Sequence, residues 1–547
     1  MKLFKKKQQK IKEKINLKYI LVSGIAFGLC FPPIPFPFFL FFAIAPFLWV
    51  LYQSDKPSTL FKATYVWGFI VNLITLYWVG SWSKETDPFL MLSGGVLLFF
   101  NPLTFFIPVY AYHLAKKFIN KAYALWLLPF FWIAYEYLYS ITDFRFPWLS
   151  IGNSAAYFNS YIQILDIIGV SGLGVLILLT NISLLKTYLA YKNKTKTFKN
   201  NLFVFTVLIL LPISYGTYKI ATYKEPNKTI KVGLIQPNLN PWNKWEAGNT
   251  ENQLNLYFEL SDYAVNKKVQ VLFYPETALP VYLLDGRNIN IVNRIKKYCN
   301  TSNVVLFKGR PHIIYYFGKN NIPKDAKLFE GVEAGYQSYN SVIRFIPHNN
   351  SADFYGKMML VPFGEKVPLV EYIPLLGDLI KWEVGISSWN TGKDTVVFNT
   401  PIKINDKPDS VKIASVICIE SIYSQFVSSF VKKGAELIAI VTNDSWYGNS
   451  SGPYQHQAIS LLRAVENRRY VVRAANGGIS CIINPLGITV TKTKMFTKDT
   501  ITGDVGLNNY ITFYTNNPFI VSGISLILFI FVFVINILRK IKVILKI

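Results

Sequence analysis

Long apolar runs fill the first 220 residues and constrain the fold of this chain more than any other feature. About 20 consecutive apolar residues form a helix long enough to cross the hydrocarbon core of a bilayer. We therefore expect seven membrane spans in this region and an eighth near the C-terminus. The expected spans are residues 19–36, 37–52, 61–82, 89–115, 122–140, 159–190, 202–220 and 518–538.

The composition agrees with a membrane protein and excludes several other classes. Of the 547 residues, 51% are hydrophobic and 16% are charged, whereas a soluble domain carries roughly 25% charged residues. This balance excludes a disordered protein, a coiled coil and a disulfide scaffold, and it argues against an ordinary cytosolic enzyme. The net charge of +26 raises nucleic-acid binding as a hypothesis. The position of the charges along the chain decides whether this hypothesis holds.

Most of the excess positive charge lies in the membrane half. Residues 222–517 carry a net charge of +8 and the remainder carries +18. The termini and the alternate short loops between spans hold 22 lysine and arginine residues, against three on the opposite side. Because cytoplasmic loops are enriched in these residues, we expect both termini in the cytoplasm, residues 221–517 on the outer face, and no nucleic-acid partner.

The chain therefore divides into three expected parts, namely a membrane domain (1–220), an outer domain (221–517) and a last span with a basic tail (518–547). The lysine-rich N-terminus lacks a small-residue cleavage site, so we interpret it as a retained anchor.

In the outer domain, short β-rich runs alternate with amphipathic stretches, which predicts an α/β layered fold. Strands are expected at 231–236, 269–274, 303–308, 411–417 and 437–441, and helices at 249–267, 287–299, 421–433 and 453–468.

Three reactive side chains stand at strand ends or in adjoining loops of the outer domain: Glu276, Lys357 and Cys418. A helix that begins after Cys418 favours its thiolate, and backbone N–H groups there could hold an oxyanion. A partly desolvated Glu276 could act as a general base, and an ammonium at Lys357 could stabilise a tetrahedral intermediate. Taken singly, each residue has an ordinary structural alternative: a core cysteine, a turn cap and a solvated lysine.

The remaining cysteines and histidines predict no metal centre and no cofactor site. The four cysteines and four histidines of the chain are scattered without metal-ligand spacing. On the outer face a disulfide between Cys299 and Cys481 is an open alternative.

Together, these residues and their flanking motifs resemble the apolipoprotein N-acyltransferases, the membrane-anchored branch of the nitrilase superfamily. The order Glu276, Lys357, Cys418 is similar to the triad of that superfamily, and the expected arrangement of spans also matches. The motifs that carry the resemblance are Tyr-Pro-Glu-Thr-Ala-Leu-Pro at 274–280, Lys-Met-Met-Leu-Val-Pro-Phe-Gly-Glu-Lys-Val-Pro at 357–368, Ile-Cys-Ile-Glu at 417–420, Thr-Asn-Asp-Ser-Trp-Tyr-Gly at 442–448 and Phe-Pro-Trp-Leu-Ser-Ile-Gly at 146–152.

The resemblance implies a fold, a reaction and a location. The outer domain would be an α-β-β-α sandwich, and the protein would sit in the bacterial inner membrane with this domain on the periplasmic side. A phospholipid would donate an acyl chain to Cys418 as a thioester, and a diacylglyceryl lipoprotein would accept it on its free α-amine. Cys418 would be the nucleophile, Glu276 the general base and Lys357 the oxyanion stabiliser.

Further residues are assigned roles by the same resemblance. Glu365 would support Lys357, Glu420 matches another position that the family needs, and Trp245 is similar to a tryptophan at the substrate entrance. Ile419 stands where the family often has tyrosine, which affects substrate contacts there and not the class of reaction. Independently, the apolar segment 370–394 predicts a mobile lid that dips toward the lipid and carries Trp382 and Trp389.

Two other functions remain as alternatives. A membrane-tethered amidase of the nitrilase type would use the same triad on a soluble amide, but it would need neither eight spans nor an apolar lid. A transporter with an outer sensing domain would place ionisable groups within its spans. Glu136 and Asp166 are the main candidates for such groups, and an interfacial position would explain both.

Overall fold

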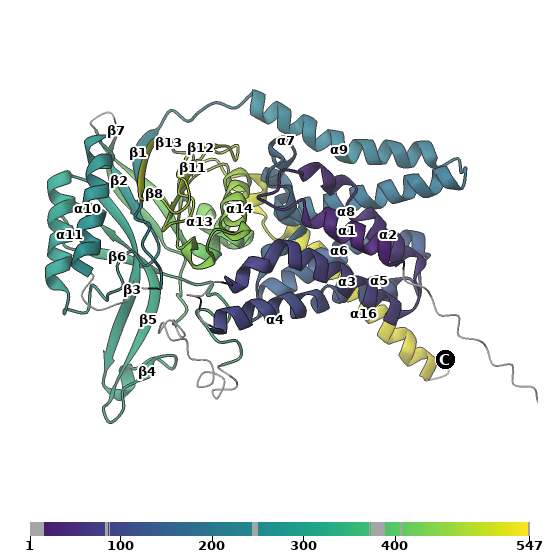
Figure 1. Ribbon diagram of the computed structural model, residues 1–547, viewed down its shortest axis with the longest axis horizontal. Coiled ribbons are helices and arrows are strands. Elements are labelled where there is room, and N and C mark those ends of the chain that lie inside the picture. Colours follow the sequence, from purple (N-terminus) through teal and green to yellow (C-terminus); the bar gives the residue numbers. More distant parts are fainter. Residues whose placement is uncertain are drawn as a thin grey trace, which may run out of the picture.

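The computed structural model describes residues 16–82, 86, 88–242, 250–370, 372, 389–404 and 407–544. Figure 1 shows a bundle of helices on one side and an α/β domain on the other. The bundle comes from the first part of the chain and from the C-terminal helix, as the hydropathy pattern predicts. Its helices are α1 (Leu17–Gly28), α2 (Ala45–Gln53), α3 (Pro57–Leu76), α4 (Pro88–Thr104), α5 (Phe106–Ala115), α6 (Lys121–Ser140), α7 (Asn159–Ile162), α8 (Leu165–Lys192), α9 (Phe198–Ala221) and α16 (Ile520–Ile544).

Five helical segments among the described residues are long and apolar enough to cross a membrane. They are Pro57–Gly80, Pro88–Ala115, Leu165–Lys192, Phe198–Ala221 and Ile520–Lys542. The expected span at 19–36 is wrong in its extent, because α1 ends at Gly28 and a turn follows. The expected span at 37–52 becomes a short 3-10 turn (Pro37–Phe41) followed by α2. The prediction of eight crossings therefore stays a prediction.

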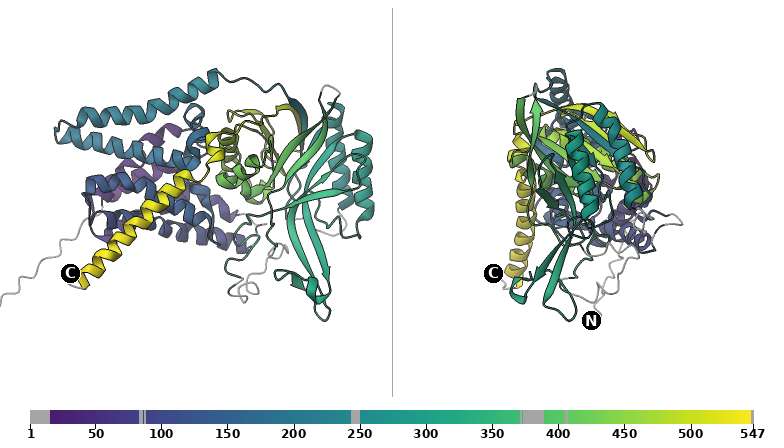
Figure 2. Two further views of the ribbon diagram at one scale, coloured as in Figure 1. Left: turned by 180° about the vertical axis from the view of Figure 1, so that it is seen from behind. Right: turned by 90° about the vertical axis from the view of Figure 1, so that its left-hand side faces the viewer.

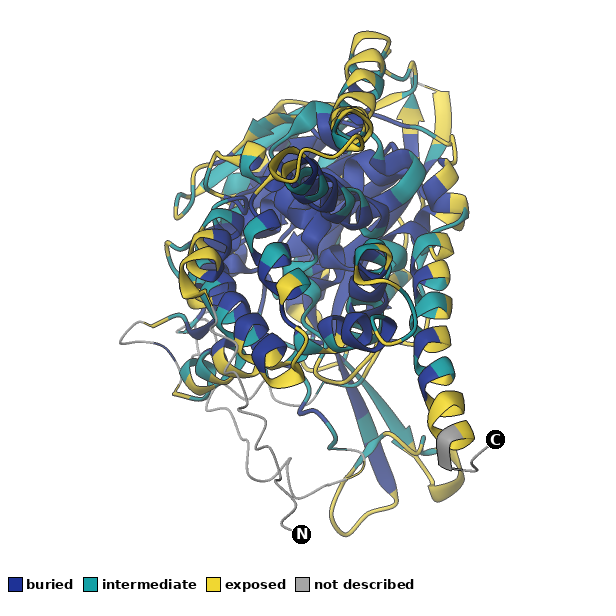
Figure 3. Cartoon of the chain, turned by 90° about the vertical axis from the view of Figure 1, so that its right-hand side faces the viewer, coloured by how far each residue is buried: buried dark blue, intermediate teal, exposed yellow. Residues whose placement is uncertain are grey.

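The outward faces of α9 and α16 are apolar and exposed. Side chains such as Phe203 and Leu211 on α9 and Ile527 and Phe531 on α16 are more than half exposed. Figure 2 shows α16 running along the outside of the bundle, and Figure 3 shows exposed residues along the same helix. Contiguous exposed apolar surface of this kind is stable only against lipid or another apolar partner.

The outer domain contains two sheets that are covered by helices. The first sheet has the strand order β13-β1-β2-β3-β5-β4, with β6 paired to β5, and the second has the order β12-β11-β10-β9-β8-β7. The strands of the first sheet are β1 (Thr229–Gln236), β2 (Val271–Tyr274), β3 (Val305–Phe317), β4 (Lys327–Leu328), β5 (Ala334–Phe345), β6 (Ala352–Gly356) and β13 (Asp499–Gly506). Those of the second are β7 (Val397–Ile404), β8 (Lys407–Ile417), β9 (Leu437–Thr442), β10 (Tyr470–Ala475), β11 (Cys481–Ile483) and β12 (Thr489–Lys492).

The helices of the outer domain give it four layers. Helices α10 (Thr250–Asn266) and α11 (Ile289–Ser302) cover the first sheet, and α13 (Ser424–Lys432) and α14 (Ser451–Asn467) lie between the second sheet and the membrane half (Figure 1). The short helix α15 (Phe513–Asn516) leads into α16. The predicted α-β-β-α sandwich is confirmed, and each predicted strand and helix of this domain has a counterpart, although β3 continues nine residues beyond the predicted end at 308.

Hydrophobic periodicity explains why these elements form. Strand β9 is buried along its whole length, as expected for a central strand paired in parallel with both neighbours. Helix α11 buries Ile291, Ile295 and Cys299, which recur every four residues and face the first sheet. Cys299 and Cys481 are both free and belong to different buried clusters, so the disulfide alternative is wrong.

Helix α14 joins the outer domain to the membrane half at a break in α8. Gly169 has φ +61° within α8, and a Cβ atom there would meet the ring of Tyr514. The break leaves the N–H of Val170 without a helical acceptor, and the carboxylate of Glu466 on α14 accepts it at 3.0 Å. Just beyond α14, Arg468 forms an ion pair of 2.8 Å with Asp166.

These contacts also account for the two acidic residues that suggested a transporter. Asp166 is bound by Arg468 and by Lys219, and Glu136 accepts a hydrogen bond from the N–H of Ile151 at 2.9 Å. Both carboxylates therefore hold parts of the structure together, and neither gives independent support to a transport path.

Candidate active site

A buried ammonium between two carboxylates forms the centre of the site. Lys357, which follows β6, lies 3.2 Å from Glu276 and 2.8 Å from Glu365. Burial lowers the pKa of Lys357, but the two carboxylates outweigh this effect and hold its pKa well above the usual range. The lysine is therefore charged, as the sequence-based role requires, and Glu365 lies beside it as predicted.

Two asparagines that the sequence did not indicate complete this cluster. Asn340 on β5 donates from Nδ2 to Glu276 at 2.7 Å and to Glu365 at 2.8 Å. The backbone N–H of Asn443, just after β9, donates to the second oxygen of Glu276 at 3.1 Å. Asn443 lies inside a motif quoted above, but nothing in the sequence pattern assigned it a partner.

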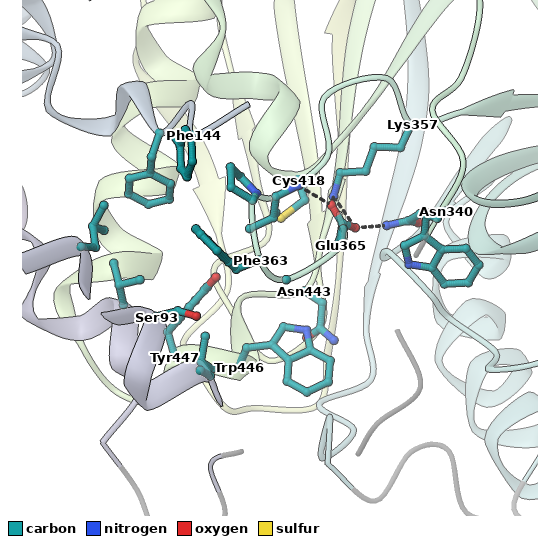
Figure 4. Close-up of a pocket in the computed structure, with 18 of the residues that line it drawn as sticks. Ser93, Phe144, Asn340, Lys357, Phe363, Glu365, Cys418, Asn443, Trp446 and Tyr447 are labelled. Atoms are coloured by element: carbon teal, nitrogen blue, oxygen red, sulfur yellow. Dashed lines mark hydrogen bonds and ion pairs between the residues drawn. The ribbon is translucent and has the colours of Figure 1, made fainter. Parts of the chain in front are cut away.

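Cys418 follows β8 directly and faces the same cavity as this cluster. Its φ is +50°, a conformation that residues other than glycine rarely adopt. Figure 4 shows its sulfur beside Lys357 and Glu365. Burial and the charge of Glu276 raise the pKa of the thiol more than Lys357 lowers it. The expectation of a favoured thiolate is therefore wrong for the resting site, and the thiol needs a base.

Glu420 fixes the two catalytic loops to each other. One of its oxygens accepts hydrogen bonds from the hydroxyl of Tyr355 at 2.7 Å and from the N–H of Met358 at 2.6 Å. Its other oxygen accepts from the N–H of Ile417 at 2.8 Å. Burial raises the pKa of Glu420 to about 7. Its contacts join the residue before Cys418 to the residue after Lys357.

A second polar group, which the sequence analysis missed, supports the backbone of Cys418. His456 on α14 lies 3.1 Å from the carbonyl oxygen of Cys418 through Nε2 and 2.9 Å from Asp444 through Nδ1. Arg473 on β10 donates to the other oxygen of Asp444 at 2.5 Å. Burial raises the pKa of Asp444, but Arg473 and His456 outweigh it and hold the pKa well below its usual range. No regular sequence spacing links these three residues.

A cavity of about 250 Å³ connects this polar cluster to the membrane half. Glu276, Lys357, Glu365 and Cys418 lie on one side of it, together with Trp389. The opposite wall comes from α4 and the end of α6, and its residues include Leu90, Val96, Leu97, Phe100 and Tyr139. Figure 4 shows Phe144 and Ser93 on the side of the membrane half. The cavity thus offers a polar reactive end and a long apolar wall.

The other residues predicted for the site have mixed outcomes. Ile419 is buried in an apolar cluster with Trp78 and Trp148 of the membrane half. Trp245, Trp382 and most of the segment 370–394 lie outside the described residues. Among the described residues, no group of three or more potential metal ligands comes together.

Comparison with known proteins gives the family. Residues 23–183 match the apolipoprotein N-acyltransferase N-terminal domain, and residues 231–513 match the carbon-nitrogen hydrolase family. An apolipoprotein N-acyltransferase of Chlorobaculum tepidum is 31% identical over 92% of this chain and 93% of its own length. The chain belongs to the apolipoprotein N-acyltransferase family.

A further relative and a solved structure are also similar to this chain. The apolipoprotein N-acyltransferase of Geobacter metallireducens is 29% identical over 90% of each chain. Among solved structures, an amidase from Nesterenkonia sp. is 13% identical, with a TM-score of 0.36 over 54% of this chain and 94% of its own. Family membership makes this chain a bacterial membrane acyltransferase whose catalytic part has a nitrilase-like fold.

Proposed function

We propose that this apolipoprotein N-acyltransferase moves an acyl chain from a membrane phospholipid to the α-amine of a diacylglyceryl-cysteine, through a thioester on Cys418. The observation that carries the proposal is the shared cavity, which places the Glu276–Lys357–Cys418 cluster at one end of an apolar wall formed by α4. A fatty acyl chain can lie along such a wall without entering water, which would otherwise cost about 0.8 kcal/mol per CH₂.

In the first half-reaction, the thiol of Cys418 attacks the ester carbonyl of the phospholipid. Glu276 takes the proton, which is consistent with the raised pKa of the thiol. Lys357 faces the oxygen that becomes negative and stabilises it. The C–O bond then breaks, the proton passes from Glu276 to the departing alkoxide, and a lysophospholipid leaves while the acyl group stays on sulfur.

In the second half-reaction, the α-amine of the acceptor attacks the thioester carbonyl. Glu276 takes a proton from the attacking amine, the C–S bond breaks, and the thiolate is reprotonated. The two substrates use one site in turn, so the kinetics should be ping-pong. Glu365 and Asn340 hold Lys357 and Glu276 in place and do not need to touch substrate.

The proposed location follows from the charge pattern. Both termini lie in the cytoplasm and the outer domain lies on the periplasmic side of the inner membrane, with boundaries at residues 1–220, 221–517 and 518–547. The apolar wall of the cavity supports this acyl transfer over the amidase alternative, because a soluble amide does not need it.

One experiment tests the proposal directly. The full chain in phospholipid vesicles is incubated with acyl-labelled phospholipid, and the peptide that contains Cys418 is examined by mass spectrometry. The acyl group should appear on Cys418 and be released by a diacylglyceryl-cysteine peptide. Cys418→Ala should carry no label; label that persists in this variant, or is absent from the parent, contradicts the proposal.

A further inference from the structure

A second hollow, here called the outer groove, lies next to the catalytic cavity. Its volume is about 320 Å³, and residues that line it include Ser81, Asn238, Asn240, Trp242, Trp446 and Phe496. Trp446 lines both hollows and therefore forms a wall between them. The ring of Trp242 packs edge-on against Trp446, with 4.9 Å between the ring centroids. Figure 4 shows Trp446 beside Asn443 at the edge of the catalytic cavity.

Hydrogen bonds fix the outer groove to the catalytic cluster. The side chain of Asn476 binds both backbone groups of Leu239, at 2.9 Å and 2.8 Å, and also donates to the side chain of Asn443 at 3.1 Å. Asn443 in turn donates its backbone N–H to Glu276. On the other side, Ser81 of the membrane half donates to the carbonyl of Trp446 at 2.7 Å. The groove is therefore a fixed part of the site.

The chemistry of the outer groove differs from that of the catalytic cavity. Its described lining residues offer amides, hydroxyls and aromatic rings, and none of them has a charged side chain. A phosphate or ammonium headgroup is bound best by charged partners. A peptide backbone instead needs uncharged donors and acceptors, together with flat apolar surface for its side chains.

We propose that the outer groove binds the peptide segment that follows the lipidated cysteine of the acceptor. This proposal rests on the proposed function, because it is the second substrate of that reaction that carries a peptide. The acyl chains of the acceptor occupy the apolar cavity and its amine points at Cys418, so its peptide leaves the site past Trp446. The groove thereby distinguishes the acceptor from the donor, which carries no peptide.

The test separates the two half-reactions in the full chain. Thioester formation on Cys418 is measured with phospholipid alone. Transfer is then measured with two acceptors, diacylglyceryl-cysteine amide and diacylglyceryl-cysteine followed by a short uncharged peptide. The parent should have a lower KM for the peptide acceptor than for the amide.

Trp242→Ala should raise the KM for the peptide acceptor about tenfold, as expected when an aromatic contact residue is truncated. Its KM for the amide and its rate of thioester formation should not change. Asn238→Gly should act in the same direction, since glycine keeps the φ of +52° found at this position while the amide side chain is lost. Phe317→Ala, which removes a 70% exposed ring at the end of β3, is the matched control and should have no effect.

Three results would overturn the proposal. The parent could show no preference for the peptide acceptor, or Trp242→Ala could raise the KM for both acceptors equally. Slower thioester formation in Trp242→Ala would instead assign the groove to the donor. Failure of the parent to form a thioester would instead contradict the proposed function itself. Because thioester formation also reports that each variant is folded, a misfolded protein cannot imitate the expected result.

Discussion

Glu420 accepts a hydrogen bond from the backbone N–H of Ile417 at 2.8 Å, so a buried acidic side chain holds the end of the strand that leads to Cys418. The same side chain binds Met358, the residue after Lys357. The relative position of Cys418 and Lys357 therefore depends in part on a side chain that is hydrogen-bonded to the neighbours of both residues.

This arrangement predicts a pH-dependent stability. The pKa of Glu420 rises from 4.5 to about 7 on burial, so the folded protein binds a proton that the unfolded chain has already lost. Its contribution is fully present below pH 4.5 and is lost as the pH rises to about 7. Glu420→Gln should remove this dependence, which is on the order of 3 kcal/mol. Thermal unfolding of both proteins between pH 4.5 and 8 measures it; parallel curves would contradict the prediction.

Asn340 is expected to act as a positioning residue for the two glutamates. Asn340→Asp keeps the shape of the side chain but replaces the donor with a third carboxylate. Thioester formation should slow by about 100-fold, at the lower end of the range found when a preorganised donor is lost. The added negative charge should also move the pH–rate profile to higher pH. Asn399→Asp, on the exposed side of β7, is the control. Slower rates with an unmoved profile would indicate a purely structural role.

The ion pair between Arg468 and Asp166 should be essential for the stability of the interface between the outer domain and the membrane half. Removing one partner of a buried ion pair leaves an uncompensated charge, which costs about 3–5 kcal/mol. Asp166→Asn should therefore lower the unfolding temperature clearly. Asp409→Asn, which breaks an exposed pair with Lys228, should leave it unchanged. Equal unfolding temperatures for all three proteins would show that the interface does not depend on this pair.

The burial of Ile419 predicts the effect of a larger side chain at this position. The side chain is 3% exposed and packs in a cluster with Trp78 and Trp148. Forcing a larger side chain into a packed core costs about 1–3 kcal/mol. Ile419→Tyr should destabilise the chain without raising its acyltransferase rate, and Ile419→Val is the conservative control. A faster rate for the tyrosine variant would show that the phenol reaches the cavity.

The sequence was most informative where local pattern and chemistry coincide. Strand β9 is an apolar run along almost its whole length and β8 ends in one, so both strands and the place of Cys418 at a strand end could be predicted. Glu365 was found through a motif. Asn340 was not, because its partners depend on the pairing of β5 with β3, which places it opposite Pro311 in the sheet. Such pairing is a long-range property that no local pattern contains.

The same limit explains the other differences. The break at Gly169 is stabilised by Glu466, almost 300 residues later in the chain. His456 lies on an ordinary amphipathic helix, and only the folded structure brings it to the carbonyl of Cys418. The pKa of the Cys418 thiol depends on how deeply the site is buried. The expectation of a favoured thiolate considered only the helix that begins after Cys418 and not this burial.

Helix α14 has a consequence for how substrates reach the enzyme. Near its first turn Gln455 binds both Trp78 and Trp148, and at its end Glu466 binds Val170, so this helix is attached to the membrane half at both ends. Its 17 residues span about 25 Å as one rigid rod. Cys418, whose carbonyl oxygen lies 3.1 Å from His456 on this rod, is consequently held at a fixed position relative to the helices of the membrane half. Under the proposed acyl transfer, such a fixed sulfur would select substrates by the depth at which they carry their reactive group, because an ester or amine anchored too deep or too far out would miss it.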